Sequence, residues 1–283
     1  MIRPHRLAAP LIAAALFAGM SGTAFAAGTA DVRVLHASPD APAVDVYLDD
    51  KIVGALTNVP FGTISDYLAI PAGGHNVKVY ATGTSSAPVI DADVTVAAGS
   101  AYTIAATGAV ADIKAQVLKD DPAPTAARAE VRVVHLSADA PAVDVATSGS
   151  AVDEAVVKGL SYPDATDYLA LPGGTYDLEV RLAGETTVAL PLPNVKVQNG
   201  RAYSVFAIGS AASPAVGGNA LQAVIAVDAM VAATATVPPT DTISATSGTS
   251  SMPTGLLLVA LVFIGATSVL IGSTVLVRRT YQD

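Results

Sequence analysis

The sequence contains no cysteine and no tryptophan, and aromatic residues make up only 5% of its 283 residues. The absence of cysteine excludes disulfides, thiol catalysis and thiolate metal sites. The absence of tryptophan weakens the case for carbohydrate stacking. Basic residues are also few, with 15 Lys and Arg against 24 Asp and Glu and a net charge of −9. This balance argues against nucleic-acid binding, which requires clustered positive charge.

The chain contains an internal duplication. Residues 32–47 read VRVLHASPDAPAVDVY, and residues 131–146 read VRVVHLSADAPAVDVA, 99 positions later (131 − 32). A period of this length corresponds to a small domain rather than to a solenoid repeat. We therefore predict a first module over 31–121 and a second over 130–228. The linker 122–129 contains two prolines, so we expect the modules to be separate, like beads.

Within each module the apolar residues alternate with polar ones. Val77 and Val79 face one way, and Lys78 and Tyr80 face the other. Period-two alternation between Gly-, Pro- and Asp-containing turns is typical of half-buried strands. Seven or eight short strands per module predict an all-β protein of two tandem immunoglobulin-like antiparallel β-sandwiches, with a small barrel as the alternative.

The two ends of the chain carry targeting patterns. Residues 1–26 combine a basic start, an apolar run and a small-residue cleavage motif, as in a secretory signal peptide. Residues 256–277 are uncharged, and a helix of this length would span about 33 Å, enough for a hydrocarbon core of about 30 Å. Arg278 and Arg279 follow it, so residues 278–283 are expected to be a cytoplasmic tail. Residues 232–253 are rich in Ser, Thr and Pro and predict an extended stalk.

The region before the apolar run also resembles a cell-wall sorting signal of Gram-positive bacteria. Such signals contain Leu-Pro-any-Thr-Gly, whereas this chain has Met252-Pro253-Thr254-Gly255, without the residue between Pro and Thr. We therefore favour a retained membrane anchor over cleavage by a sortase.

One polar constellation recurs in both modules with the same spacing. Imidazole and carboxylate groups in this pattern could ligate zinc, or the carboxylates could hold calcium. The structural alternative is that the aspartates cap turns before Ala-Pro and that the histidines lie at the edge of the core. The candidate residues are His36, Asp40, Asp45, His135, Asp139 and Asp144.

Catalytic motifs are not evident. The sequence has no G-x-S-x-G nucleophile elbow and no Gly-rich loop that opens onto a helix. Asp91 and Asp93 are interpreted as part of a solvated strand face. Recurrent tyrosines are interpreted as aromatics at the core edge; they are Tyr67, Tyr102, Tyr168 and Tyr203. Pro39, Tyr47 and His75 are not shared by the second copy, which makes them candidates for contact with a partner.

The segment His36 to Tyr47, with its second copy from His135 to Val145, resembles the hallmark of the bacterial domain of unknown function 4397 family. The later Tyr-Leu-x-Ile/Leu-Pro-x-Gly stretch, at 67–73 and 168–174, fits the same family. The resemblance implies immunoglobulin-like secreted or surface modules, often in tandem, and it implies no established activity.

These observations lead us to expect a non-enzymatic, membrane-anchored bacterial cell-surface protein. Its modules would be extracellular, would contact an extracellular or envelope partner or serve as spacers, and would need no cofactor. The single span would place it in the plasma membrane. The alternative is a surface domain that binds a metal or small ligand at the repeated His/Asp turn.

Overall fold

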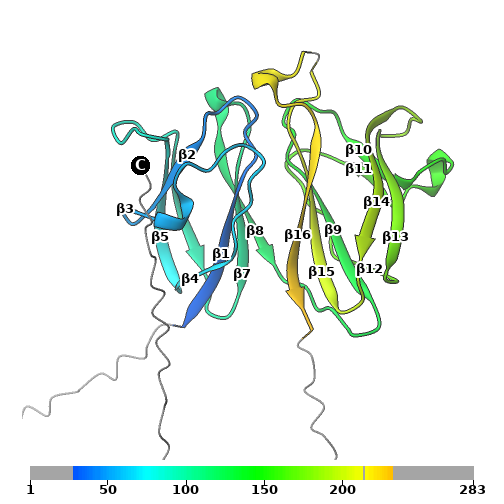
Figure 1. Ribbon diagram of the computed structural model, residues 1–283, viewed down its shortest axis with the longest axis horizontal. Helices are drawn as coiled ribbons and strands as arrows, with labels where there is room; N and C mark the ends of the chain where they lie inside the picture. Colours follow the sequence, from blue (N-terminus) through cyan, green and yellow to red (C-terminus); the bar gives the residue numbers. More distant parts are fainter. Residues whose placement is uncertain (1–27, 213, 232–283) are drawn as a thin grey trace, which may run out of the picture. The chain divides into compact units, whose positions relative to one another are not determined.

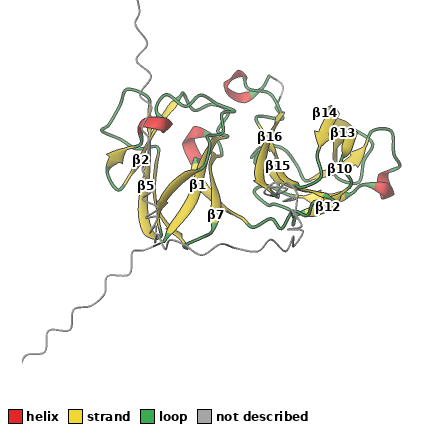
Figure 2. Ribbon diagram, turned by 60° about the horizontal axis from the view of Figure 1, so that its bottom comes forward, coloured by secondary structure: helices red, strands yellow, loops and turns green. Residues whose placement is uncertain are grey.

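The computed structural model describes residues 28–212 and 214–231, and these residues fold as two β-sandwich modules (Figure 1). Each module has eight strands, and the only helices among the described residues are four single 3₁₀ turns (Figure 2). The turns are η1 (Gly54–Leu56), η2 (Val110–Asp112), η3 (Val152–Glu154) and η4 (Val216–Gly218). The predicted all-β class is confirmed.

In the first module each of the two sheets has four strands. One sheet has the order β4-β1-β7-β8, and the other has the order β3-β2-β5-β6. The first consists of β4 (Leu68–Pro71), β1 (Thr29–His36), β7 (Ala101–Thr107) and β8 (Lys114–Asp120). The second consists of β3 (Lys51–Ile52), β2 (Val44–Leu48), β5 (Gly73–Ala81) and β6 (Ile90–Val96).

The second module repeats this topology strand for strand, with the orders β12-β9-β15-β16 and β11-β10-β13-β14. The first sheet consists of β12 (Leu169–Leu171), β9 (Ala129–His135), β15 (Arg201–Ile208) and β16 (Gln222–Met230). The second consists of β11 (Val157–Leu160), β10 (Val143–Thr147), β13 (Gly174–Leu182) and β14 (Val188–Val197).

The sheets are not wholly antiparallel, which corrects the prediction. Strand β1 pairs with β7 in parallel, and β9 pairs with β15 in parallel, whereas the other strand pairs are antiparallel. A period-two pattern identifies the two faces of a strand but carries no information about the direction of its neighbours. The parallel pair forms because the chain passes through the opposite sheet between these two strands.

Each module has its own core between its two sheets. The period-two alternation along the strands explains this core. On β5, for example, Val77 and Val79 are buried while Lys78 and Tyr80 are partly exposed. Together with valines and isoleucines of the facing sheet they form the inner cluster of the first module. The second module has equivalent clusters.

The modules are not separate beads, because a further apolar cluster joins them. Its members come from the outward faces of the β1 sheet and the β9 sheet, and most are fully buried. They are Leu35, Ala37, Ala105, Leu118, Val134, Leu136, Phe206 and Ile208. The described residues of both modules, 28–212 and 214–231, accordingly belong to one compact unit. The expectation of independent modules fails because these strands are apolar on both faces and need a second covering layer.

The terminal segments for which the sequence predicts targeting and anchoring lie outside the described residues. This applies to the signal peptide at 1–26, the stalk at 232–253, the span at 256–277 and the tail at 278–283. Within 28–212 and 214–231, no helix is long and apolar enough to cross a membrane.

Candidate functional site

The two predicted histidines are buried at the ends of β1 and β9. The Nε2–H of His36 donates to the carbonyl of Pro42 at 3.0 Å, and the Nε2–H of His135 donates to that of Pro141 at 3.1 Å. Burial lowers the pKa of both imidazoles, although the bond to the proline carbonyl acts in the opposite direction. Each histidine therefore ties the end of a strand to the turn that follows it.

The aspartates at the start of this turn bind another loop. Asp40 accepts a hydrogen bond from the backbone N–H of Val110 at 2.8 Å. Asp139 accepts from the Ser210 hydroxyl at 2.6 Å and from the N–H of Ala211 at 3.0 Å. Burial alone would raise the pKa of Asp139, but these donors outweigh it and the pKa is lowered. Both carboxylates thus fasten the turn to the loop after the β7 or β15 strand.

The second pair of aspartates, Asp45 on β2 and Asp144 on β10, also accepts hydrogen bonds from other loops. Asp45 accepts from the N–H groups of Asn58 at 2.7 Å and Gly83 at 3.2 Å. The bond from Asn58 is the main reason that the pKa of Asp45 lies below its usual range. Asp144 accepts from the N–H groups of Gly159 at 2.7 Å and Gly184 at 2.9 Å.

The six predicted candidates therefore do not form one polar pocket. Each side chain binds its own set of backbone and hydroxyl groups, and those groups lie on different loops. In the described part of the chain no group of three His, Cys, Asp or Glu side chains is arranged to hold a metal ion. What recurs in the two modules is the chemistry of a turn.

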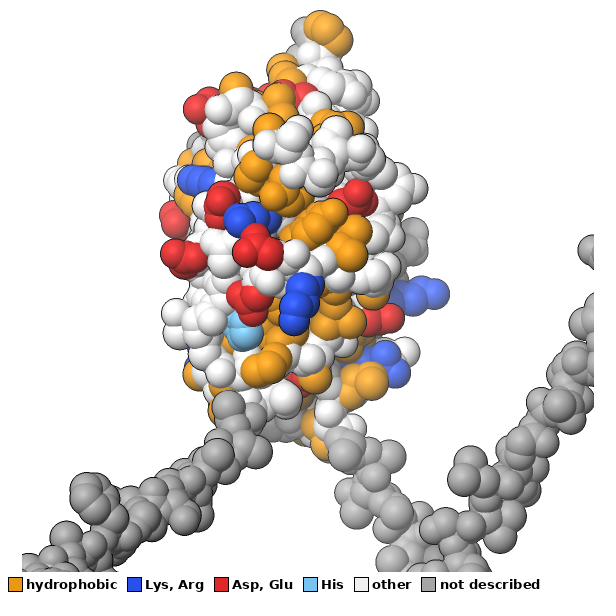
Figure 3. Space-filling view, turned by 90° about the vertical axis from the view of Figure 1, so that its left-hand side faces the viewer, with side chains coloured by type: hydrophobic (Ala, Val, Ile, Leu, Met, Phe, Trp, Pro, Cys, Tyr) orange, Lys and Arg blue, Asp and Glu red, His pale blue; other side chains and the backbone are white. Residues whose placement is uncertain are grey.

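A different set of residues is presented on the outward face of the β2–β5–β6 sheet. The rings of Tyr47 and Tyr80 meet edge to face with centroids 5.0 Å apart. Beside them Lys78 donates to Asp50 at 2.6 Å, and Asn76 donates to carboxylates of β6. We call Tyr47, Tyr80, Lys78, Asn76, Asp91 and Asp93 the tyrosine face. The side of the molecule seen in Figure 3 carries charged side chains of both signs among hydrophobic ones.

The second module lacks this face. At the equivalent positions of the repeat, the second module has Ala146 in place of Tyr47, Glu179 in place of Lys78 and Arg181 in place of Tyr80. Arg181 forms a largely buried ion pair with Glu179 and donates to the carbonyl of Ser150 at 2.8 Å. The equivalent surface is therefore occupied by an internal ion pair, and the aromatic pair is a property of the first module alone.

The structure also shows a network that the sequence analysis did not identify. Arg33 on β1 forms an ion pair with Asp228 on β16, and Arg132 on β9 forms one with Asp120 on β8. Each pair joins one module to the other. The exposed fraction of these four side chains is 4% or less.

Tyrosines and hydroxyls complete this network. Tyr67 donates to Asp120 at 2.6 Å, and Tyr168 donates to Asp228 at 2.7 Å. The guanidinium carbon of Arg33 lies 4.6 Å from the centroid of the Tyr67 ring, in cation–π geometry. Burial, with the neighbouring aspartate, raises the pKa of both tyrosines. The recurrent tyrosines at 67 and 168 thus belong to the junction between the modules.

One sequence signal could have indicated this junction. Arg33 and Arg132 occupy the same position of the repeat, in strands where alternation would place them toward solvent. The next outward residues, however, are Leu35 and Val134, and β15 contains the unbroken run Val205-Phe206-Ala207-Ile208. Strands that are apolar on both faces indicate that both faces are buried.

Comparison with solved structures gives matches of low identity and low TM-score. The Bacillus anthracis TIE protein is 12% identical with a TM-score of 0.21; the match covers 65% of this chain and 34% of that one, so the chain spans about a third of its length. The family 26 carbohydrate-binding module CBMbc of Eubacterium rectale Amy13K, solved with maltoheptaose, is 9% identical with a TM-score of 0.22, covering 71% and 97%. A candidate cell adhesion protein of Bacteroides eggerthii is 10% identical with a TM-score of 0.19, covering 74% and 98%.

Comparison with curated proteins gives no match. A family model, by contrast, matches most of the described chain, over residues 30–146 and 150–238. Its first segment extends beyond β8 into the second module, whereas the structural repeat divides between Asp120 and Ala129. The two matched segments and the repeated strand topology agree on two copies. The chain belongs to the family of the domain of unknown function DUF4397, with two tandem copies.

Proposed function

We propose that this chain is an exported, membrane-anchored bacterial surface protein that acts by binding rather than by catalysis. Its two modules would stand outside the cell and contact an extracellular or envelope partner. The support for export and anchoring is the signal-like segment 1–26 and the apolar segment 256–277 followed by two arginines. The support for a binding role is the arrangement of the two modules.

The observation that carries the proposal is the buried junction between the modules. The β1 sheet and the β9 sheet cover each other. The faces that a lone module would expose there are therefore buried and cannot contact a partner. The outward faces of the other two sheets are left for a partner. Only the first module carries a tyrosine pair there, and tyrosine is enriched at interfaces because it combines apolar area with a polar tip.

We further propose that the modules are immunoglobulin-like. The support is a tyrosine near the start of the seventh strand of each module whose hydroxyl accepts a bond from the backbone upstream. Tyr102 accepts from the N–H of Ala97 at 3.2 Å, and Tyr203 accepts from that of Gln198 at 3.1 Å. A comparable tyrosine corner is characteristic of immunoglobulin-type sandwiches.

Localisation and binding can be tested together on intact cells that produce the full chain. External protease should remove the modules while a cytoplasmic marker survives. Purified protein of residues 28–231 should bind the envelope fraction of the producing bacterium. The double substitution Tyr47→Ala and Tyr80→Ala should weaken this binding.

Lys196→Ala is the matched control, because Lys196 is exposed on the outward face of the second module. It should leave binding unchanged. Modules that survive protease treatment of intact cells would contradict the surface location. Equal binding by the tyrosine double variant would contradict the role of the tyrosine face.

A further inference from the structure

The first module contains an apolar cavity between its two sheets. Its volume is about 240 Å³, and the twelve residues that line it are all aliphatic. For comparison, an engineered cavity of about 150 Å³ lined by similar side chains stays dry and takes up benzene. Val46 and Val77 of one sheet and Ile104 of the other are among the buried lining residues. The cavity is therefore large enough for an apolar guest, and the side chains that line it offer no polar partner.

The cavity opens at one side of the sandwich. Strands β3 and β4 are the edge strands of the two sheets there, and at the opposite side β6 lies against β8. Leu48, Val53 and Leu68 line the cavity and are partly exposed to solvent. A guest can thus enter between the β2–β3 hairpin and β4.

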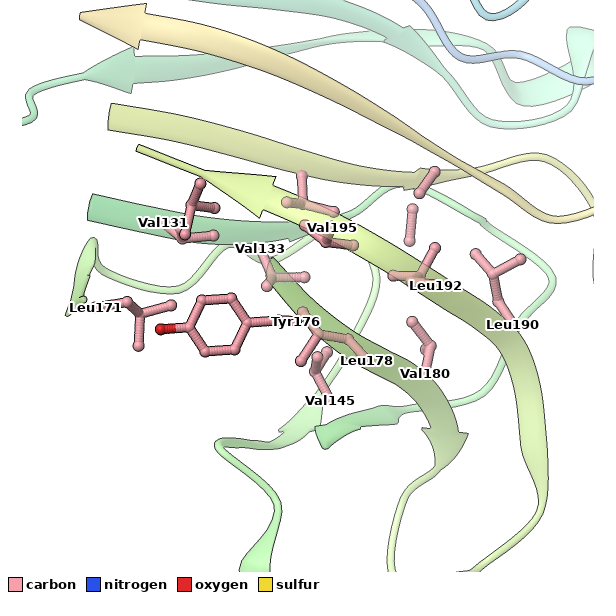
Figure 4. Close-up of a pocket in the computed structure, with 14 residues that line it drawn as sticks. Val131, Val133, Val145, Leu171, Tyr176, Leu178, Val180, Leu190, Leu192 and Val195 are labelled. Atoms are coloured by element: carbon pink, nitrogen blue, oxygen red, sulfur yellow. The ribbon is translucent and has the colours of Figure 1, made fainter. Parts of the chain in front are cut away.

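The second module has filled the equivalent space. There the inter-sheet volume is divided between pockets of about 40, 100 and 30 Å³, and Tyr176 lines the first two. Figure 4 shows the Tyr176 ring among the valines and leucines of this core. In the first module the corresponding residue is His75, which does not line the cavity. Its smaller ring binds the Asp49 carboxylate and the Pro71 carbonyl, each at 2.8 Å, whereas the larger Tyr176 reaches the equivalent Pro172 carbonyl with its hydroxyl.

One lysine is paired across a hairpin with a residue that lines the cavity. Lys51 pairs with Leu48 across the β2–β3 hairpin. Directly opposed residues of an antiparallel pair project to the same side of the sheet. The side chain of Lys51 therefore leaves the backbone on the same side as that of Leu48, which lines the cavity. The neighbouring carboxylates bind other side chains, Asp49 that of His75 and Asp50 that of Lys78, although the charge of Lys51 also helps to lower the pKa of Asp49. None of the ion pairs within the described residues includes Lys51.

We propose that the first module binds one free fatty acid, with its aliphatic chain in this cavity and its carboxylate at the ammonium group of Lys51. An aliphatic lining, an opening to solvent and one cation on the hairpin beside that opening match the two ends of such a molecule. The second module would not bind it, since Tyr176 occupies the space and Ser150 stands at the position of Lys51 in the hairpin. This site is separate from the tyrosine face.

The test uses residues 28–231, which form a compact unit with their own cores. Dodecanoate, kept below its micelle-forming concentration, is titrated into this protein by calorimetry. We expect saturable binding of one molecule per chain and a rise in Tm with ligand concentration, because a ligand that binds only the folded state stabilises it.

Leu68→Trp should block the mouth and remove this binding. The matched control is Leu169→Trp at the equivalent position of β12, which should bind as the parent protein does. Circular dichroism establishes that both variants are folded. If Leu68→Trp fails to fold, Val53→Trp blocks the same mouth from the η1 side.

Lys51→Ala should lower the affinity for dodecanoate about twofold to fivefold, the effect of an exposed ion pair. The affinity for dodecanol should not change. The proposal is overturned if dodecanoate shows no saturable binding, if Leu68→Trp binds it normally, or if Leu169→Trp removes the binding instead. An equal loss of dodecanol and dodecanoate affinity in Lys51→Ala would overturn the assignment of the carboxylate to this lysine.

Discussion

Arg33 and Asp228 form a buried ion pair across the junction of the two modules, although they are 195 positions apart in the chain. The repeat generates a second pair of the same kind, between Arg132 and Asp120. In this pair the arginine comes from the second module and the aspartate from the first. Such reciprocity is what a symmetric dimer interface would have, here built within one chain. The duplication therefore accounts for the junction as well as for the modules.

Breaking either pair should strongly destabilise the protein. Arg33→Ala leaves Asp228 buried without its cation, and such a loss typically costs about 3–5 kcal/mol. Arg132→Ala should cost a similar amount for the same reason. Urea denaturation of residues 28–231 measures both values. Arg128→Ala, at an exposed site, is the control and should change stability by less than about 0.5 kcal/mol. A cost for Arg33→Ala as small as that of the control would show that the junction contributes little to stability.

Tyr67→Phe should remove a hydrogen bond to a buried carboxylate while it keeps the ring beneath Arg33. Hydrogen bonds to charged groups contribute about 1.5–3 kcal/mol, so we expect a loss in this range. Tyr168→Phe should behave alike. Tyr80→Phe, on the outward tyrosine face, serves as the comparison and should be nearly neutral. The same denaturation measurement decides, and a neutral Tyr67→Phe would contradict the role given to its hydroxyl.

The buried histidines predict that the protein loses stability in acid. The pKa of His36 and of His135 is lowered in the folded state, so between the folded and the unfolded value the unfolded chain binds more protons. The contribution of these two histidines to the free energy of unfolding is complete above the unfolded pKa of about 6.5. It is lost as the pH falls from that value through the lower pKa of the folded state. Tm should therefore decrease as the pH is lowered from about 7 to 5.

His75 should respond in the opposite direction. Its bond to Asp49 raises its pKa, so its contribution is complete below the unfolded pKa and is lost as the pH rises through the folded value. A titration of the histidine resonances by NMR separates the two cases. His75 should titrate above about 6.5, and His36 and His135 below it. Asp49→Asn should bring only His75 back toward the ordinary value. A raised pKa at His36 would contradict the buried, neutral imidazole.

Removal of metal ions should leave stability unchanged. Asp45 and Asp144 already accept backbone hydrogen bonds, so they are expected to cap turns without a cation. Thermal unfolding with a chelator and with added zinc or calcium should give the same Tm. Asp45→Ala should lower Tm equally in all these solutions. A Tm that rises with either metal in the parent protein but not in Asp45→Ala would show a metal site.

The elements of the core could be predicted from the sequence, because one face of each strand is apolar and the alternation shows it. Val77 and Val79 lie inside, as their spacing requires. The duplicated segments likewise indicate two equal folding units, and the repeated aspartates indicate turns. The repeat drew attention to the His/Asp turn, but the sequence did not indicate the partners of its side chains, since the amides that bind Asp40 and Asp45 lie in remote loops.

The tertiary structure alone decided what covers the second face of β1 and β9. A sequence pattern shows that Leu35 and Phe206 are apolar, but it does not show whether they meet each other, another chain or a membrane. The direction of pairing between β1 and β7 is equally invisible, since period two is the same in parallel and antiparallel strands. The cavity of the first module depends on one side chain: His75 and Tyr176 both bind the equivalent proline carbonyl, but only the Tyr176 ring lines the space between the sheets. Such choices are made by packing between residues that are distant in sequence, which local pattern does not record.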